Sequence, residues 1–408
     1  MNNKVKKKAW ISARHQVVRD VVCLFLAPYS KIKYGIKIEK FKRENKRNYL
    51  VLYNHQTPFD QFFVGMAFKK HLYYVATEDI FSNGWVSKLI KYLVNPIPIK
   101  KQTTDVRAIL NCIKVAKEGG SIAIAPEGNR TYSGKTEYIN PSIVALARKL
   151  GLPVLFYRIE GGYGAEPRWS DVVRKGKMRG YVSRVLETSE YEKMTDDELL
   201  SVICTELMVD ESRSNMDHKH KKKAEYLERA IYVCKTCGLS IFESKGNFIK
   251  CTRCGAEAEY LSNNQIRAVK GDIPFSSVNE WYEYQKQYVN SLDVAALTSD
   301  PIYHESTALR KVIPYKEKIL LEKRAMVSLY GDRLELQGLD IGKKELLFKD
   351  ISSVAVLGRN KLNIYYGDDI YQFKSDKRFN ALKYVNIYFR YQNQMKGDSI
   401  KDGEFLGI

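Results

Sequence analysis

The sequence predicts an α/β domain with a mainly parallel sheet and flanking helices, then a small cysteine-containing module and a mostly β C-terminal domain. Apolar strand-like runs alternate with helix-like segments from residue 49 to about 210, two Cys-x2-Cys pairs follow, and short alternating strands then lead to a last helix. Alternating strands and helices are typical of a parallel sheet covered by helices. At 408 residues the chain is longer than one hydrophobic core usually serves.

Residues 1–48 form a basic segment that we expect to associate with a membrane. Residues 1–50 carry fourteen Lys and Arg against three Asp and Glu, and the net charge of the chain is +20. The longest apolar run, residues 21–29, is far shorter than the roughly 18–20 residues of a membrane span. We predict an amphipathic or re-entrant helix over residues 10–29, lying in the interface of an anionic membrane. A packed N-terminal helix with a solvated basic rim is the alternative.

The alternating pattern occupies residues 49–210. We expect strands at 49–53, 72–76, 97–99, 121–125, 152–157 and 180–186. Pro96 and Pro98 confine the third of these strands to a sheet edge or a loop. Helices are expected after Pro58 and over 85–94, from Thr104 or Asp105 to about 118, over 141–150, and from 195 to about 209.

The first motif whose residues could take part in catalysis follows the first of these strands and contains His55 and Asp60. Thr57 has the chemistry of a helix N-cap, Pro58 suits the first helical position, and Asp60 then falls at the third. The histidine therefore lies in a turn where the carboxylate can reach it, and an imidazole oriented by a carboxylate is a general base for an alcohol. The N–H groups of the helix start also favour an anion. Ordinary helix-start chemistry beside a structural histidine is the alternative.

The second motif, residues 126–131, ends the strand at 121–125. Ligands of α/β proteins bind in loops at the carboxyl ends of strands. Arg130 offers a planar fork for phosphate or carboxylate. Glu127 can orient that arginine or accept a hydrogen bond from a substrate hydroxyl. An ordinary turn with an Arg–Glu surface pair is the alternative.

Together the two motifs resemble the glycerolipid (1-acylglycerol-3-phosphate, or lysophosphatidate) acyltransferase family. His55 and Asp60 match its Asn-His-x4-Asp box, and residues 126–131 match its Pro-Glu-Gly-x-Arg-Ser box with Thr131 in place of serine. Residues 97–101 resemble a third box, in which Lys101 stands where the family has arginine. Residues 152–154 resemble the fourth box without its second proline. The resemblance covers roughly residues 30–210.

The resemblance implies an O-acyltransferase of phospholipid synthesis that works at a membrane surface. His55 would act as general base and Asp60 would orient it. Arg130, helped by Lys101, would hold the phosphate of a lysophosphatidate-like acceptor, and Gly128 would let the backbone approach the ligand closely. The acyl donor would be acyl-CoA or acyl-carrier protein, and no catalytic metal is expected.

Four cysteines define the next module. Cys234, Cys237, Cys251 and Cys254 form two Cys-x2-Cys knuckles, each followed by Gly, which is typical of a four-cysteine ribbon holding structural Zn²⁺ over residues 231–262. Two disulfides or iron in the same geometry are the alternatives. The charged residues 211–230 before it are predicted to form a linker helix.

The remaining cysteines indicate the compartment. Cys23, Cys112 and Cys204 each lie singly in apolar surroundings, as reduced cysteines do. We therefore expect a peripheral or monotopic protein on the cytoplasmic side of a membrane.

The C-terminal part is predicted to be a mixed connecting region at 263–315, a β domain at 316–395 and a tail at 396–408. Alternating strands separated by Gly-containing turns and closed by a helix over 377–394 resemble a pleckstrin-homology-like barrel. Such a domain binds lipid head groups or proteins, or only docks.

The sequence is therefore compatible with three hypotheses of function. The protein is an acyltransferase with a lysophosphatidate-like acceptor, an acyltransferase for another glycerolipid or lysolipid acceptor, or an inert acyltransferase fold that acts as a zinc-ribbon binding module. A nucleic-acid partner is disfavoured because Lys and Arg are near parity with Glu over residues 231–262.

Overall fold

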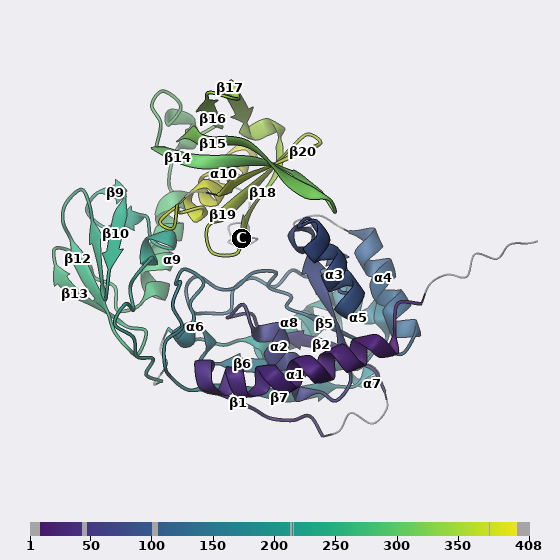
Figure 1. Cartoon of the computed structure of the whole chain (residues 1–408). Coiled ribbons are helices and arrows are strands. Elements are labelled where there is room, and N and C mark those ends of the chain that lie inside the picture. The colour runs from purple at the N-terminus through teal and green to yellow at the C-terminus, as the bar shows by residue number, and fades with distance from the viewer. Residues whose placement is uncertain are drawn as a thin grey trace, which may run out of the picture.

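The computed structural model describes residues 9–42, 47–99, 105–212, 214, 216–374 and 376–397. An α/β domain lies opposite a C-terminal half-barrel, and the cysteine module joins the two at one side (Figure 1). This arrangement of elements confirms the predicted fold class, including the mainly parallel first sheet.

The first sheet has seven strands in the order β1-β7-β6-β2-β5-β3-β4. All neighbours are parallel except β6 and β7, which are antiparallel. The short strand β4 lies at the sheet edge, as Pro98 within it and Pro96 just before it predict. The strands are β1 (Ile36–Ile38), β2 (Leu50–Tyr53), β3 (Leu72–Thr77), β4 (Ile97–Ile99), β5 (Ser121–Ile124), β6 (Val154–Glu160) and β7 (Met178–Leu186).

Helices cover both faces of this sheet. On one face α1 (Ala13–Tyr34) and α2 (Asp60–Ala67) enclose an apolar core. On the other face the core is closed by α4 (Val106–Lys117), α5 (Ser142–Leu150) and α8 (Asp196–Leu207). The other helices are α3 (Trp85–Val94), α6 (Gly162–Ala165) and α7 (Thr188–Tyr191). The central strands β2, β5 and β6 are thus buried on both sides, which their apolar sequences require.

The N-terminal helix α1 lies across the α/β domain and is longer than the 10–29 predicted. Its inner side is fixed by polar contacts: Arg19 donates hydrogen bonds to the carbonyls of Gly65 and Phe68, and the His15 ring lies 3.0 Å from the Tyr73 hydroxyl. In the described parts of the chain, no helix is both long and apolar enough to cross a membrane.

The cysteine module is larger than predicted and is not preceded by a helix. Within the described part of residues 211–230 the chain forms turns and extended pieces, with only a short 3-10 helix at Leu227–Arg229, so the predicted linker helix is wrong. The charged side chains there alternate with residues that bury fully, such as His218 and Ala224, and this segment packs between domains rather than in solvent. The strands are β8 (Val233–Cys234), β9 (Gly238–Leu239), β10 (Phe242–Lys245), β11 (Phe248–Cys251), β12 (Glu257–Tyr260) and β13 (Ile266–Lys270).

The C-terminal domain is an antiparallel half-barrel followed by a helix. Seven strands run in the order β17-β16-β15-β14-β20-β19-β18. Its first strand, β14, lies within residues 263–315, the region that we expected to be a mixed connection. The elements after α9 (Val278–Asn290) are β14 (Tyr303–Ile313), β15 (Glu317–Leu329), β16 (Arg333–Gly338), β17 (Gly342–Leu347), β18 (Ile351–Leu357), β19 (Lys361–Tyr366), β20 (Asp369–Lys374) and α10 (Leu382–Met395).

The half-barrel and the cysteine module share one hydrophobic core, and both rest on the α/β domain. That core runs from Trp169 of the α/β domain through Tyr232 and Trp281 to Val385 of α10. At the other end of the half-barrel, the β14–β15 hairpin reaches α3 (Figure 1), where the Gly84 N–H donates to the Lys316 carbonyl at 3.0 Å. The three parts therefore form one packed unit.

Candidate active site

His55 and Asp60 are in direct contact at the carboxyl end of β2. The His55 Nδ1 atom lies 2.8 Å from Asp60 Oδ2, and the histidine side chain is 23 % exposed while the carboxylate is fully buried. This contact leaves Nε2 of the histidine for a substrate. The carboxylate fixes the ring and favours the tautomer with its proton on Nδ1.

The turn that holds this pair differs from the predicted helix cap. Helix α2 begins at Asp60 itself, not at Pro58, because the carboxylate folds back over the turn. It accepts hydrogen bonds from the N–H groups of Gln56 (2.6 Å) and Thr57 (2.9 Å) and from the Thr57 hydroxyl (2.7 Å). Those N–H groups are thus already bound and do not form the anion site that we expected at this helix start.

The Glu127 carboxylate links the second motif to the first. It accepts a hydrogen bond from the His55 backbone N–H at 2.8 Å, and the Thr131 N–H donates to the His55 carbonyl at 3.4 Å. In the described residues no ion pair joins Glu127 to Arg130. Burial raises the pKa of Glu127 to about 8, although the His55 N–H opposes this shift. In this geometry Glu127 holds the histidine turn in place.

Arg130 is buried at 8 % exposure in the wall of a cavity next to His55. Its Nη1 atom has no hydrogen-bond partner among the described residues. Burial, together with the nearby Arg168 charge, lowers the pKa of Arg130 to about 10. A buried guanidinium with an unused donor is costly unless an anion binds it. Arg130 is therefore suited to a phosphate or carboxylate.

The other two residues that we predicted to contact a ligand are Gly128 and Lys101. Gly128 has φ +69°, a backbone conformation that favours glycine, and a Cβ there would meet no protein atom within 4 Å. Its close approach to a ligand stays a prediction. Lys101 lies outside the described residues.

Arg168 is a site residue that the sequence did not reveal, since it stands alone between two short turns. It is 2 % exposed and lines the same cavity. Its guanidinium donates to the carbonyls of Arg130 (3.1 Å), Val356 (3.0 Å) and Gly358 (2.9 Å). Arg168 thus ties the second motif to the turn after β18 in the C-terminal domain.

The cavity itself has a volume of about 1640 Å³. His55, Glu127 and Arg130 lie in its wall. The lining also includes apolar residues of α1, α2, α3 and α4, namely Val18, Val22, Leu26, Phe62, Ile90, Leu93 and Ile109. Ligand sites usually measure about 300–1,000 Å³, so this cavity has room for a long apolar group beside a polar one.

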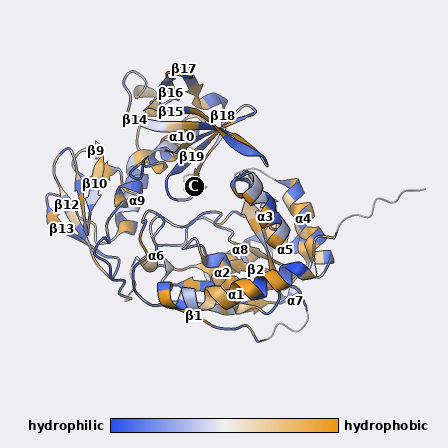
Figure 2. Ribbon diagram, viewed as in Figure 1, coloured by the Kyte–Doolittle hydropathy of each residue, from blue (hydrophilic) through white to orange (hydrophobic). Residues whose placement is uncertain are grey.

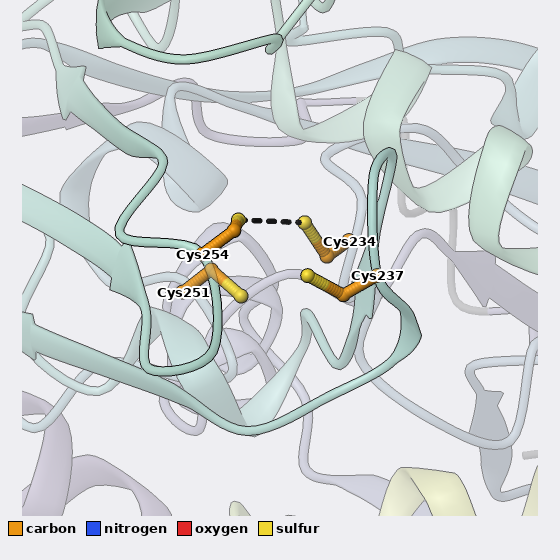
Figure 3. A group of neighbouring side chains, drawn as sticks. All are labelled: Cys234, Cys237, Cys251 and Cys254. Atoms are coloured by element: carbon orange, nitrogen blue, oxygen red, sulfur yellow. Dashed lines mark hydrogen bonds between the residues drawn. The ribbon is translucent and has the colours of Figure 1, made fainter.

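The four predicted metal ligands meet in the cysteine module (Figure 3). Their sulfur atoms lie within 4.8 Å of one another, and the Cys234 and Cys254 sulfurs are 3.6 Å apart. All seven cysteines of the chain are described and none is in a disulfide. Both knuckle glycines have positive φ, +69° at Gly238 and +74° at Gly255. Zinc bound tetrahedrally at about 2.3 Å from sulfur needs sulfurs about 3.8 Å apart, so the cluster could bind a metal of this kind.

Comparison with known proteins identifies the class of the α/β domain. Residues 35–159 match the family model described as Acyltransferase. A 1-acyl-sn-glycerol-3-phosphate acyltransferase of Bacillus subtilis (strain 168) is 21 % identical over 176 residues, which cover 42 % of this chain and 84 % of that protein.

Two solved structures are also similar in part. The 1-acyl-sn-glycerophosphate (LPA) acyltransferase PlsC from Thermotoga maritima is 22 % identical, with a TM-score of 0.39, over 48 % of this chain and 81 % of that chain. The N-terminal PH domain of human ARAP2 is 17 % identical, with a TM-score of 0.20, over 24 % of this chain and 88 % of that chain.

The chain therefore contains an acyltransferase domain, built around the His55–Asp60 pair and the Glu127–Arg130 loop. Within that class it is a distant homologue of the lysophosphatidate acyltransferases.

Proposed function

We propose that this protein transfers a fatty acyl group from an acyl thioester, acyl-CoA or acyl-carrier protein, to the hydroxyl of a lysophosphatidate-like acceptor in phospholipid synthesis. The observation that supports this proposal most strongly is the His55–Asp60 contact, because His55 lines a large, mostly apolar cavity. Arg130, which is buried and whose Nη1 atom has no hydrogen-bond partner among the described residues, lines the same cavity.

The reaction follows from this geometry. His55 Nε2 takes the proton of the acceptor hydroxyl. The oxygen of that hydroxyl then attacks the carbonyl carbon of the thioester. The C–S bond breaks, and the departing thiolate takes the proton from the imidazolium, so no covalent acyl-enzyme forms. Asp60 holds the imidazole and stabilises its charged form. A buried carboxylate that is already hydrogen-bonded to the turn keeps this orientation before substrate binds.

Arg130 binds the acceptor phosphate in this proposal. Arg130 has one unused donor and lines the cavity that also contains the general base, so binding the phosphate would place the acceptor near His55. Lys101 stays a predicted helper.

The membrane supplies the acceptor, and we propose that α1 lies on the anionic, cytoplasmic surface of that membrane. One side of α1 exposes a stripe of large apolar residues, while α3 exposes Trp85, Leu89 and Tyr92. Figure 2 shows hydrophobic segments alternating with hydrophilic ones along α1. Lys31 and Lys37 flank the stripe for lipid phosphates. The cavity lining includes the inner residues of the same two helices, so a lipid could pass from the bilayer into the site. The stripe consists of Val17, Val21, Leu24, Phe25, Tyr29 and Ile32.

We further propose that the four cysteines hold a structural Zn²⁺. All four tetrahedral positions would be filled by thiolates, which leaves no position for catalysis.

The test is a transfer assay with purified protein, liposomes containing lysophosphatidate and labelled oleoyl-CoA. We expect labelled phosphatidate from the wild type and a loss of about 10²–10⁴-fold or more in His55→Ala. His304→Ala, an exposed histidine of the C-terminal domain, is the matched control and should keep full activity. If the wild type stays inactive with acyl-carrier protein and with a panel of lysolipids, or if His55→Ala keeps its turnover, the proposed function is wrong.

A further inference from the structure

The lining of the cavity divides between the two faces of the first sheet. Tyr74 and Met66 lie in the core that α1 and α2 cover, whereas Cys112 and Ile143 lie in the core that α4 and α5 cover, and all four line the same cavity. Because the sheet separates its two faces, one cavity reaches both cores only past the strand ends or the sheet edge. His55, which lines the cavity just after β2, lies where strand ends give way to loops.

The part of the cavity between α1 and α2 is here named the α1 arm. Its lining positions in α1 recur every four residues, at 18, 22 and 26, so they share one helical face. The exposed apolar stripe of α1 lies on another side of the helix. This helix is thus apolar both toward the cavity and toward the outside. The lining of the arm includes Val18, Val22, Leu26, Phe62, Gly65 and Met66.

The part of the cavity between α4 and α5 is here named the α4 arm. Ala108, Ile109 and Cys112 line it from one side of α4, and Ile143 and Leu146 line it from α5. Cys112 is 2 % exposed, so this arm reaches into the apolar core of the domain. The next residue after Ile109 is Leu110, which is 58 % exposed and does not line the cavity. The two arms therefore lie on opposite faces of the sheet, and each has its own pair of helices.

The size of the cavity agrees with two occupants. Its volume of about 1640 Å³ exceeds the roughly 300–1,000 Å³ of a usual site for one ligand. A direct attack of the acceptor hydroxyl on the thioester needs both substrates bound at the same time. Each of these substrates carries a long apolar chain, and each chain leaves the reacting atoms in its own direction.

We propose that the cavity binds two acyl chains at once, the chain of the acceptor in the α1 arm and the chain of the donor in the α4 arm. This inference rests on the proposed function. The acceptor is a membrane lipid, and α1 is apolar on its outer side as well as toward the cavity, so the acceptor chain enters along α1. The donor chain then occupies the arm on the opposite face of the sheet, with its carbonyl carbon at His55.

The first test measures kcat/KM for octanoyl, myristoyl and palmitoyl donors with one lysophosphatidate. Ile109→Trp narrows the α4 arm and should lower the palmitoyl-to-octanoyl ratio by at least about tenfold, since one methylene group in an apolar pocket changes the rate by about 10–200-fold. Ile109→Ala widens the arm and should raise that ratio. Leu110→Trp, the same substitution on the exposed side of α4, is the matched control and should keep the wild-type ratio.

The second test varies the acceptor instead, with lysophosphatidates of the same three chain lengths and one donor. Val22→Trp narrows the α1 arm and should lower the preference for the long acceptor chain while the donor ratio stays that of the wild type. Ile109→Trp should leave the acceptor ratio unchanged. The two variants are thus controls for each other.

The outcomes separate this inference from the proposed function. If both variants alter the chain preference for the same substrate, or neither alters any preference while the wild type is active, the two-chain cavity is wrong and the acyltransferase function is unaffected. An exchange of the two effects overturns the assignment of the arms. A wild type inactive toward every donor and acceptor overturns the proposed function and this inference together. If Ile109→Trp does not fold, as judged by circular dichroism, Ile109→Ala decides.

Discussion

At the scale of single residues, replacing Arg130 should affect binding of the acceptor most directly. Arg130→Ala should lower kcat/KM for the acceptor by at least about tenfold, chiefly through KM, because a charge-assisted hydrogen bond is worth about 1.5–3 kcal/mol. Arg130→Lys should recover part of this loss by restoring the charge without the planar fork. Initial rates over a range of lysophosphatidate concentrations measure both. Unaltered acceptor kinetics in Arg130→Ala would exclude the phosphate role.

Glu127 makes stability depend on pH. The pKa of its carboxyl rises from an ordinary value of 4.5 to about 8 because the group is buried. The folded chain therefore holds a proton that the unfolded chain has lost between those pH values, so this group lowers stability as pH rises through that window. Glu127→Gln removes the dependence and keeps an oxygen for the His55 N–H.

The measurement for Glu127 is urea unfolding of wild type and Glu127→Gln at pH 5 and pH 8.5. The free energy of unfolding of the variant minus that of wild type should be higher by at least about 1 kcal/mol at pH 8.5 than at pH 5, since only wild type loses stability over this range. An equal difference at both pH values would show that the pKa of Glu127 is not raised in the folded chain.

The residues that the sequence identified are those whose chemistry is local. His55 and Asp60 are five positions apart and meet within one turn, and the four cysteines lie in two short knuckles, so spacing alone predicts their contacts. Arg168 could not be predicted, because its partners at Val356 and Gly358 are almost two hundred positions away. The same limit applies to Glu127, whose bond to the His55 backbone depends on strands β2 and β5 being neighbours.

At the scale of elements, α1 is the helix whose surface demands an explanation. Leu24 is 71 % exposed and Phe25 68 %, although burial of such side chains is normally favourable. The double variant Leu24→Glu and Phe25→Glu should lose binding to anionic vesicles in a flotation assay while its circular dichroism stays unchanged. Leu339→Glu, at a fully exposed position in the C-terminal domain, is the matched control. Retained vesicle binding in the double variant would refute the membrane role of α1.

The cysteine knuckles lead to an element-scale prediction about metal content. Cys254→Ser should abolish bound zinc and lower the melting temperature, because the knuckles close the sheet β10–β13 that shares its core with the C-terminal domain. Elemental analysis of freshly purified protein and thermal unfolding measure these effects. Cys204→Ser, in α8, should keep the metal. Wild-type protein without zinc or iron would exclude the ribbon as a metal site.

At the scale of the whole molecule, the sequence indicated separate domains, whereas the structure packs them as one unit. The predicted boundary at residue 316 divides the half-barrel, because β14 pairs with both β15 and β20. Strand pairing over such separations depends on contacts between distant segments, which periodicity along one segment does not contain. The same holds for the predicted linker at 211–230, where Glu211 and His218 are buried between domains.

A substitution of Arg168 would test whether the packing of the domains against one another affects catalysis. Arg168→Ala removes a hydrogen-bond donor from the carbonyls of Arg130, Val356 and Gly358, where the acyltransferase domain meets the C-terminal half-barrel. Since the loss of a hydrogen bond costs about 0.5–1.5 kcal/mol, the half-barrel should separate more readily from the second motif. We expect faster amide hydrogen exchange in the turn after β18 and in the loop at 126–131, with lower kcat/KM and little change in the ribbon sheet.

A matched control separates this local effect from a general loss of stability. Arg324→Ala removes an exposed arginine of β15 and should leave both the exchange rates and the kinetics unchanged. If Arg168→Ala exchanges like the wild type at both the turn and the loop, the two domains do not depend on this residue for their contact. If exchange rises but kcat/KM stays constant, the C-terminal domain docks on the cavity without contributing to the reaction.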